Sequence, residues 1–150
     1  MTASPIAPFP PSPLVGDGAD AVSRIDLHLH SRASGAAGNW WVQALGMGTE
    51  VLESYTAPEA ARALALGAGM DFVTLTDHES IDGALAICHY PDVLVGVEVS
   101  TSFPEDGTSA DVLVSGLDRA MLADLQARRP DAKRLVALLR EAGLPFVLAH

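Results

Sequence analysis

The stretch of sequence that decides the fold is RIDLHLH, at residues 24–30. Apolar and polar residues alternate along it, which is typical of a β-strand. The polar members would project together from one face: Asp26, His28 and His30. Two imidazoles placed in this way can chelate one metal ion without moving the backbone, and Asp26 could orient one of the rings. Alone, the pair does not distinguish a metal site from two ordinary strand histidines.

Short apolar runs and helix-like stretches alternate through the rest of the chain. The predicted strands are residues 71–76 (DFVTLT), 93–100 (VLVGVEVS), 110–116 (ADVLVSG) and 145–149 (PFVLA). FPEDG, at residues 103–107, has the composition of a hairpin turn. The predicted helices are residues 39–45, 80–89, 119–128 and 131–142, together with one that begins near residue 56. This order predicts an α/β domain with a largely parallel sheet of about five strands, the last of them at an open edge.

The helix near residue 56 carries the clearest start signals. Thr56 occupies the expected N-cap position, Pro58 lies in the first turn, and Glu59 completes a Thr-x-x-Glu capping box. The side chains expected to face the core are Ala60, Ala61, Leu64 and Ala65. This helix would pack its small residues against the sheet.

Further candidate ligands stand on the later strands, most of them at a strand's C-terminal end. Asp77 and His78 follow the second strand, where Asp77 could ligate a metal or orient an imidazole, and Asp77 or Ser80 could instead cap the next helix. Glu98 lies in an otherwise apolar strand, so it either faces solvent at a sheet edge or meets cations. His150 follows the last strand, whereas His89 has no such position and is expected to be an ordinary residue.

The order of these motifs is more specific than any one of them. The four motifs are DLHLHS at residues 26–31, TLTDHESIDG at 74–83, GVEVS at 96–100 and VLAH at 147–150. In this order they resemble the first four motifs of the PHP (polymerase and histidinol phosphatase) family. The resemblance covers residues 24–150 and implies a distorted (β/α)7 barrel. Because a complete (β/α) barrel takes about 250 residues, the chain is expected to hold an incomplete one.

The resemblance also implies a function. It implies a hydrolase that uses two or three divalent metal ions (Zn, Mn or Fe) to cleave a small phosphate monoester or nucleotide. The ligands it implies are His28 and His30 for a first metal, Glu98 as a bridge, His150 for a second metal and His78 for a third. Asp26 and Asp77 would support these ligands. Such metal-assisted hydrolysis needs no protein nucleophile.

Some positions depart from the family pattern. Gly35 and Ala36 stand where many members carry an acidic or histidine ligand for the third metal. Asp111 stands where the returning strand often carries a histidine, and an oxygen ligand there would favour Mn, Mg or Fe. The family's closing Asp-x-His motif would lie beyond His150. These departures leave a second interpretation open, namely a non-catalytic PHP-like module or an inactive fragment.

Composition and charge restrict the possible partners. Lys and Arg total 9 against 19 Asp and Glu, a formal charge of −10. This balance argues against a nucleic-acid scaffold, although bound metals would still admit a small phosphorylated substrate. No apolar run approaches the roughly 20 residues of a membrane span. The single cysteine, Cys88, excludes an internal disulfide, fits a cytoplasmic protein and is expected to be buried.

The two ends of the chain differ in composition. Residues 1–22 contain five of the ten prolines and no periodic apolar pattern, so we expect a disordered tail. Residues 23–150 are expected to form a single PHP-like domain, truncated at its C-terminal end relative to a complete barrel.

Overall fold

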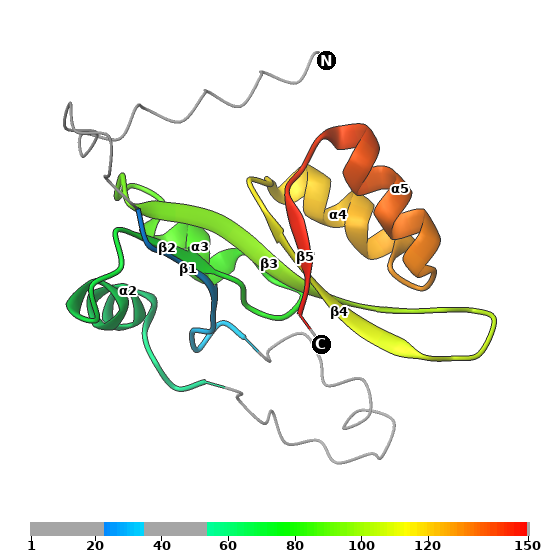
Figure 1. Cartoon of the computed structure of the whole chain (residues 1–150). Helices are drawn as coiled ribbons and strands as arrows, with labels where there is room; N and C mark the ends of the chain where they lie inside the picture. The colour runs from blue at the N-terminus through cyan, green and yellow to red at the C-terminus, as the bar shows by residue number, and fades with distance from the viewer. Residues whose placement is uncertain (1–22, 35–53, 150) are drawn as a thin grey trace.

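Five strands and four helices make up the described part of the chain (Figure 1). The structure is a computed structural model, and it describes residues 23–34 and 54–149. The elements are β1 (Ile25–Leu29), α2 (Pro58–Gly67), β2 (Phe72–Leu75), α3 (Asp82–Ile87), β3 (Val93–Ser102), β4 (Ser109–Ser115), α4 (Arg119–Arg128), α5 (Ala132–Ala142) and β5 (Phe146–Leu148). The predicted α/β class is confirmed. The predicted tail (1–22), the helix predicted at residues 39–45, and Gly35, Ala36 and His150 lie outside the described residues.

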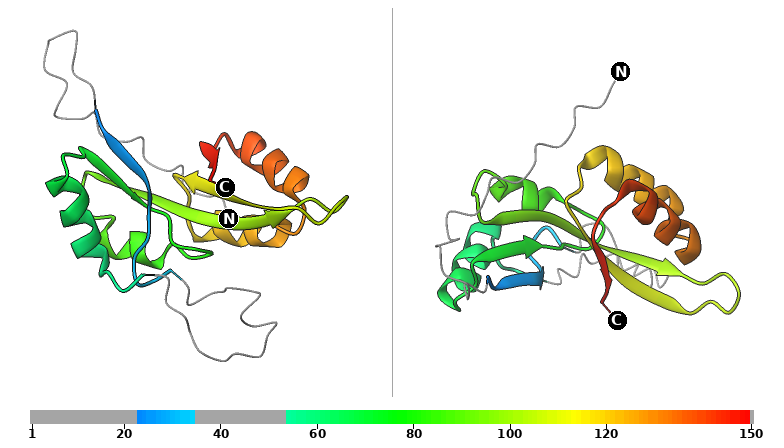
Figure 2. Two further views of the ribbon diagram at one scale, coloured as in Figure 1. Left: turned by 60° about the horizontal axis from the view of Figure 1, so that its bottom comes forward. Right: turned by 45° about the horizontal axis from the view of Figure 1, so that its top comes forward.

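All the strands belong to one mixed sheet in the order β1-β2-β3-β4-β5. The pairs β1–β2 and β2–β3 are parallel, whereas β3–β4 and β4–β5 are antiparallel. The prediction of a largely parallel sheet was therefore wrong. The hairpin turn folds β4 back onto the free edge of β3, and β5 therefore pairs with β4 and not with β3. The sheet curls like part of a barrel wall (Figure 2).

The helices pack on one face of the central strand β3. Val97 and Val99 are fully buried and pack with Leu125 of α4 and Leu139 of α5. Figure 1 shows α4 and α5 side by side next to β5, with α2 beside β1 at the other end of the sheet. Because side chains alternate along a strand, Glu98 projects from the face opposite these valines. The face without the helices therefore carries the buried carboxylate.

The start of α2 differs from the capping box predicted at Thr56. Ala57 is the N-cap, with no side-chain hydrogen bond, and Pro58 is the first helical residue. Proline suits that position because it lacks an N–H and its φ is fixed, and it holds the preceding residue in an extended conformation. The Thr56 carbonyl instead accepts a hydrogen bond from the backbone N–H of Arg32 at 2.8 Å.

Burial along α2 and α3 confirms part of the predicted pattern. The predicted core residues Ala61 and Ala65 are buried, whereas Ala60 is exposed and Leu64 is 69% exposed. Helix α3 is shorter than predicted, and Cys88, which directly follows it, is exposed rather than buried. Among the described helices, none is long and apolar enough to cross a membrane.

Two strands lie at the sheet edges. The predicted open edge at the last strand is confirmed, since β5 pairs only with β4 and Val147 is 53% exposed. The opposite edge is β1, where Leu27 is 47% exposed. The strand that contains His28 and leads into His30 is thus an edge strand of the sheet.

Candidate metal centre

Three imidazole rings converge on one buried carboxylate oxygen. The Nε2 atoms of the rings lie 3.0, 3.1 and 3.4 Å from Oε2 of Glu98, in the order His28, His30 and His78. Glu98 is fully buried, whereas the rings are 19–35% exposed. The carboxylate therefore lies at the buried side of the cluster, and the imidazole rings lie at its partly exposed side.

The backbone explains how residues so far apart in sequence meet. β1 and β2 run parallel, but their pairing is irregular between Asp26 and Leu29, as in a β-bulge. Bulges re-aim side chains at functional sites, and this irregular stretch contains Leu27 and His28. Beyond β2 the chain continues alongside β3, where His78 forms an isolated parallel bridge with Glu98. For this reason a residue in the middle of β3 faces residues at the ends of its neighbours.

The charge of Glu98 is set by its surroundings. Burial acts to raise the pKa of its carboxyl group, because burial disfavours the charged form. Hydrogen bonds with His30 and His28, together with the charge of His78, outweigh burial and lower the pKa to about 2. Glu98 is therefore a buried anion at neutral pH.

The carboxylate of Asp111 joins a second group of potential ligands. Oxygen and nitrogen atoms of His78, Glu98 and Asp111 lie within 4.8 Å of one another, as do those of His28, His30 and Glu98. Asp111 pairs with Ser100 across the hairpin, and the Ser100 hydroxyl donates a hydrogen bond to its Oδ1 at 2.6 Å. Glu98 belongs to both groups, so one carboxylate could serve two ions.

The donor set fits divalent metal ions. Zinc binds imidazole nitrogen at about 2.0–2.1 Å, so neighbouring ligand atoms of a tetrahedral site lie about 3.3 Å apart. The separations between Glu98 Oε2 and the histidine Nε2 atoms, 3.0–3.4 Å, match that spacing. Imidazoles suit Zn and Fe, and the additional carboxylate of Asp111 suits Mn. The histidine and Glu98 atoms are thus already spaced as the ligands of a divalent ion would be.

A buried serine, which the sequence interpretation missed, contacts two of the histidines. Ser34 Oγ lies 3.1 Å from Nδ1 of His30 and accepts a hydrogen bond from the backbone N–H of His78 at 3.0 Å. When Nε2 of His30 presents its lone pair to a metal, Nδ1 carries the proton and donates a hydrogen bond to the Ser34 hydroxyl. In the sequence, Ser34 is only a small polar residue four positions after the second histidine of the His-x-His pair, which does not by itself indicate this contact.

Asp77 supports the loop that carries this serine. It is 1% exposed, and its two carboxylate oxygens accept hydrogen bonds from the N–H and the hydroxyl of Ser31 at 2.6 and 2.8 Å. Neither Asp77 nor Ser80 is the N-cap of α3, which is Ile81 without a side-chain cap hydrogen bond, although the Ser80 hydroxyl accepts from the N–H of Asp82 at 3.1 Å. Asp77 therefore ties the end of β2 to the loop after β1.

The other predicted residues lie in different surroundings. Asp26 accepts a hydrogen bond from the backbone N–H of His28 at 3.2 Å, a contact with the backbone and not with an imidazole ring. His89 is exposed and lies against the ring of Tyr90. The last described residue, Ala149, donates its N–H to the Asp111 carbonyl at 2.8 Å, so β5 ends beside Asp111.

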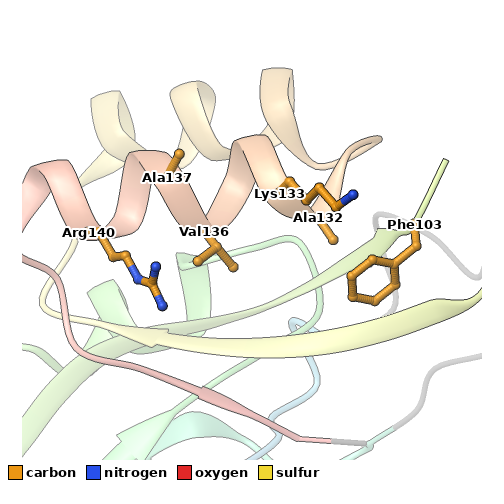
Figure 3. Close-up of a pocket in the computed structure, with 6 residues that line it drawn as sticks. All are labelled: Phe103, Ala132, Lys133, Val136, Ala137 and Arg140. Carbon is orange, nitrogen blue, oxygen red and sulfur yellow. The ribbon is translucent and has the colours of Figure 1, made fainter. Parts of the chain in front are cut away.

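A separate pocket of about 290 Å³ opens between α5 and the turn after β3 (Figure 3). Its lining residues are Phe103, Ala132, Lys133, Val136, Ala137 and Arg140. None of them belongs to the histidine cluster, so this pocket and the candidate metal centre are different places on the molecule.

Comparison with known proteins gives distant structural similarities. No protein-family model and no curated protein sequence matches the chain. An amidohydrolase from Chromobacterium violaceum, solved with bound sulfate and no metal, is 25% identical with a TM-score of 0.45, over 81% of this chain and 39% of that one. A proposed metal-dependent phosphoesterase from Bifidobacterium adolescentis is 17% identical with a TM-score of 0.46, over 82% and 51%. The chain thus spans about half or less of either protein. With TM-scores below 0.5, these similarities do not indicate the chemistry of the chain, which depends on its own residues.

Proposed function

We propose that this chain forms the metal centre of a PHP-type, metal-dependent phosphoesterase that hydrolyses a small phosphate monoester or nucleotide. The observation that carries the proposal is the convergence of three imidazole nitrogens on the buried, ionised carboxylate of Glu98. A buried anion facing partly exposed nitrogen ligands is a ready cation site, because the carboxylate needs no proton removed before it binds a metal.

In this proposal each ligand group holds one ion. His28, His30 and Glu98 would hold the first ion, and His78, Asp111 and Glu98 would hold the second, so that Glu98 would serve both. The family resemblance adds His150 to the second ion and places His78 on a third, whereas in the structure His78 shares a group with Asp111. Bound divalent ions would supply Lewis-acid polarisation of the phosphoryl group and activation of water.

The chain's own residues would prepare the site for that chemistry. Glu98 offsets part of the positive charge of both ions, Ser34 fixes the ring orientation of His30, and Asp77 holds the loop on which Ser34 lies. The partial exposure of the rings leaves an open side from which a phosphate ester can approach. A phosphate is a plausible anionic partner despite the net charge of −10, because the metals would make the site locally positive.

The test begins with metal binding and proceeds to turnover. Chelator-treated protein would be titrated with Zn and Mn by calorimetry, and bound metal counted by elemental analysis. Phosphate release would then be followed on a panel of phosphate monoesters and nucleotides. We expect about two ions per chain, at most three by the family resemblance, and metal-dependent release that His30→Ala abolishes.

The matched control is His89→Ala, which removes an exposed histidine outside the cluster and should leave binding and turnover unchanged. Metal binding without turnover on any ester would favour the alternative, a non-catalytic PHP-like module. Absence of metal binding in the folded wild-type protein would refute the proposed function and leave only the alternative, a non-catalytic PHP-like module or an inactive fragment.

A further inference from the structure

Glu79, which directly follows His78, has an unusual backbone conformation. Its φ is +56°, and it is the only non-glycine residue in the described ranges with a positive φ. A side chain in this left-handed region is disfavoured unless the surrounding structure holds it there, and such residues cluster at functional sites. The position of the outlier, next to a candidate metal ligand, suggests a role for it.

Contacts on several sides hold Glu79 in place. Its N–H donates to the Glu98 carbonyl at 2.9 Å, and its carbonyl accepts from Gln126 Nε2 at 3.0 Å. Oε1 accepts from the backbone N–H of Ser100 at 2.9 Å and lies 2.6 Å from Nη1 of Arg129. Glu79 is 5% exposed, so its carboxylate depends on these partners for its charge to be tolerated.

Both long side chains that reach Glu79 come from one helix. Gln126 lies in α4 and Arg129 is its C-cap. The Arg129 carbonyl is itself fixed, since it accepts a hydrogen bond from the Thr101 hydroxyl of β3 at 2.6 Å. The end of α4 is thus attached both to β3 and to the residue after His78.

We propose that the Glu79–Arg129 pair is a latch that positions His78 for metal binding and makes the geometry of the metal centre depend on the docking of α4. The inference rests on the proposed function. Without the ion pair, Glu79 would relax towards negative φ, and the chain after His78 would turn away from β3. The His78 ring would then leave its position 3.4 Å from Glu98 and its stacking on His30, where the ring centroids are 5.1 Å apart.

The test compares this ion pair with another one of similar chemistry. Glu79→Gln, Arg129→Gln and the double variant remove the latch, while Arg129→Lys retains the charge. The matched control is Arg62→Gln, which breaks the ion pair with Asp92, formed through a 2.8 Å hydrogen bond from Nε and a 2.7 Å one from Nη2. Zinc affinity would be measured by calorimetry on the full chain. The cross-peak between the His30 and His78 ring protons would be measured by NMR in chelator, without metal.

Each latch variant is expected to weaken zinc binding about 10- to 100-fold, as removing a partner behind a metal ligand commonly does. The zinc affinity of the double variant should be no lower than that of the single variant that binds zinc more weakly, because both substitutions remove the same interaction. Arg129→Lys should restore part of the affinity, and the inter-ring cross-peak should disappear in the Gln variants. Arg62→Gln should lower the melting temperature and change neither readout.

Wild-type zinc affinity and an intact cross-peak in folded latch variants would overturn the proposal. If the wild-type protein binds no zinc, the proposed function fails, and the cross-peak in chelator still decides whether the latch positions His78.

Discussion

Two clusters of charged side chains flank the parallel strands, and they are built differently. Next to the start of β3, Arg62 binds Asp92 through two hydrogen bonds and lies 3.9 Å above the centroid of the Tyr90 ring. Further along the same strand, Glu98 faces His28, His30 and His78. The first cluster pairs one permanent cation with one anion.

The second cluster gathers three imidazole rings around one buried carboxylate oxygen. The Arg62–Asp92 pair joins one permanent cation to one anion, whereas the Glu98 cluster consists of the nitrogen and oxygen atoms that bind divalent metals. The difference separates a charge pair that stabilises the fold from a charge arrangement suited to binding a metal. Substitutions in the two clusters should then affect different quantities.

The largest effect is expected for Glu98→Gln. The substitution keeps the size of the side chain and removes the charge shared by both ligand groups, so metal affinity should fall by more than about 100-fold, beyond the effect of losing an outer partner. Calorimetric titration with Zn and Mn measures the loss. A variant that retains wild-type affinity would contradict the bridging role of Glu98.

The next effect is expected for Gly83→Ala, which tests the support behind the metal cluster. A Cβ at Gly83 would lie 2.1 Å from Asp77 Oδ2 and 2.4 Å from Ser31 Oγ, both buried. Forcing the two apart should destabilise the protein by about 3 kcal/mol and weaken metal binding. Chemical denaturation in chelator measures the first effect and calorimetry the second.

The matched control for this substitution is Gly67→Ala at the end of α2, where an added Cβ meets no atom within 4 Å. It should be neutral or stabilise the protein by up to about 1 kcal/mol, because alanine favours a helix more than glycine does. Equal effects of the two substitutions would show that the Asp77–Ser31 contact is not tightly constrained.

A smaller effect is expected at the complete ion pair. Asp92→Asn should lower the free energy of unfolding by about 2 kcal/mol, since hydrogen bonds to charged groups contribute about 1.5–3 kcal/mol. Metal affinity should stay within about twofold of wild type, because Asp92 lies outside both ligand groups. A marked loss of metal affinity in Asp92→Asn would contradict the view that the Arg62–Asp92 pair stabilises the fold without contributing to metal binding.

The last prediction concerns pH in the metal-free protein. The pKa of Glu98 is lowered from 4.5 to about 2 in the folded state, so its ionised form stabilises the fold at pH values above 4.5. That contribution should be lost as the pH falls from 4.5 towards about 2. Denaturation of wild type and Glu98→Gln in chelator should show a stability difference that shrinks over this range. A difference that does not change with pH would contradict the lowered pKa.

The sequence predicted the chemically distinctive residues better than their supports. His28, His30, His78 and Glu98 were identified because imidazoles and a carboxylate are conspicuous at strand ends or in an apolar strand. Ser34 was missed because a serine in a loop has no sequence feature that marks a contact with a distant backbone N–H. The ligand types are thus visible locally, whereas the contacts that orient them depend on the tertiary fold.

The backbone was predicted least well where neighbouring elements decide it. The hairpin turn was predicted, but the antiparallel pairing of β5 with β4 was not, because it depends on which strand edge is free once β4 has paired with β3. Glu79 gives no sign of a positive φ, which glycine or asparagine would have suggested. Thr56 matched a capping box, but Pro58 fixed the first turn one residue later.

The position of β1 at the edge of the sheet has a consequence for the order in which the site forms and opens. Glu98 belongs to a hairpin whose strands are close in sequence, whereas His28 reaches it across 70 residues. Contacts of long sequence separation form late in folding, and short edge strands open first in the native state. The backbone amides of β1 should then exchange with deuterium faster than those of β3. His28 and His30 would be the last ligands to arrive and the first to leave, so the residence time of a bound ion would follow the opening of one five-residue strand.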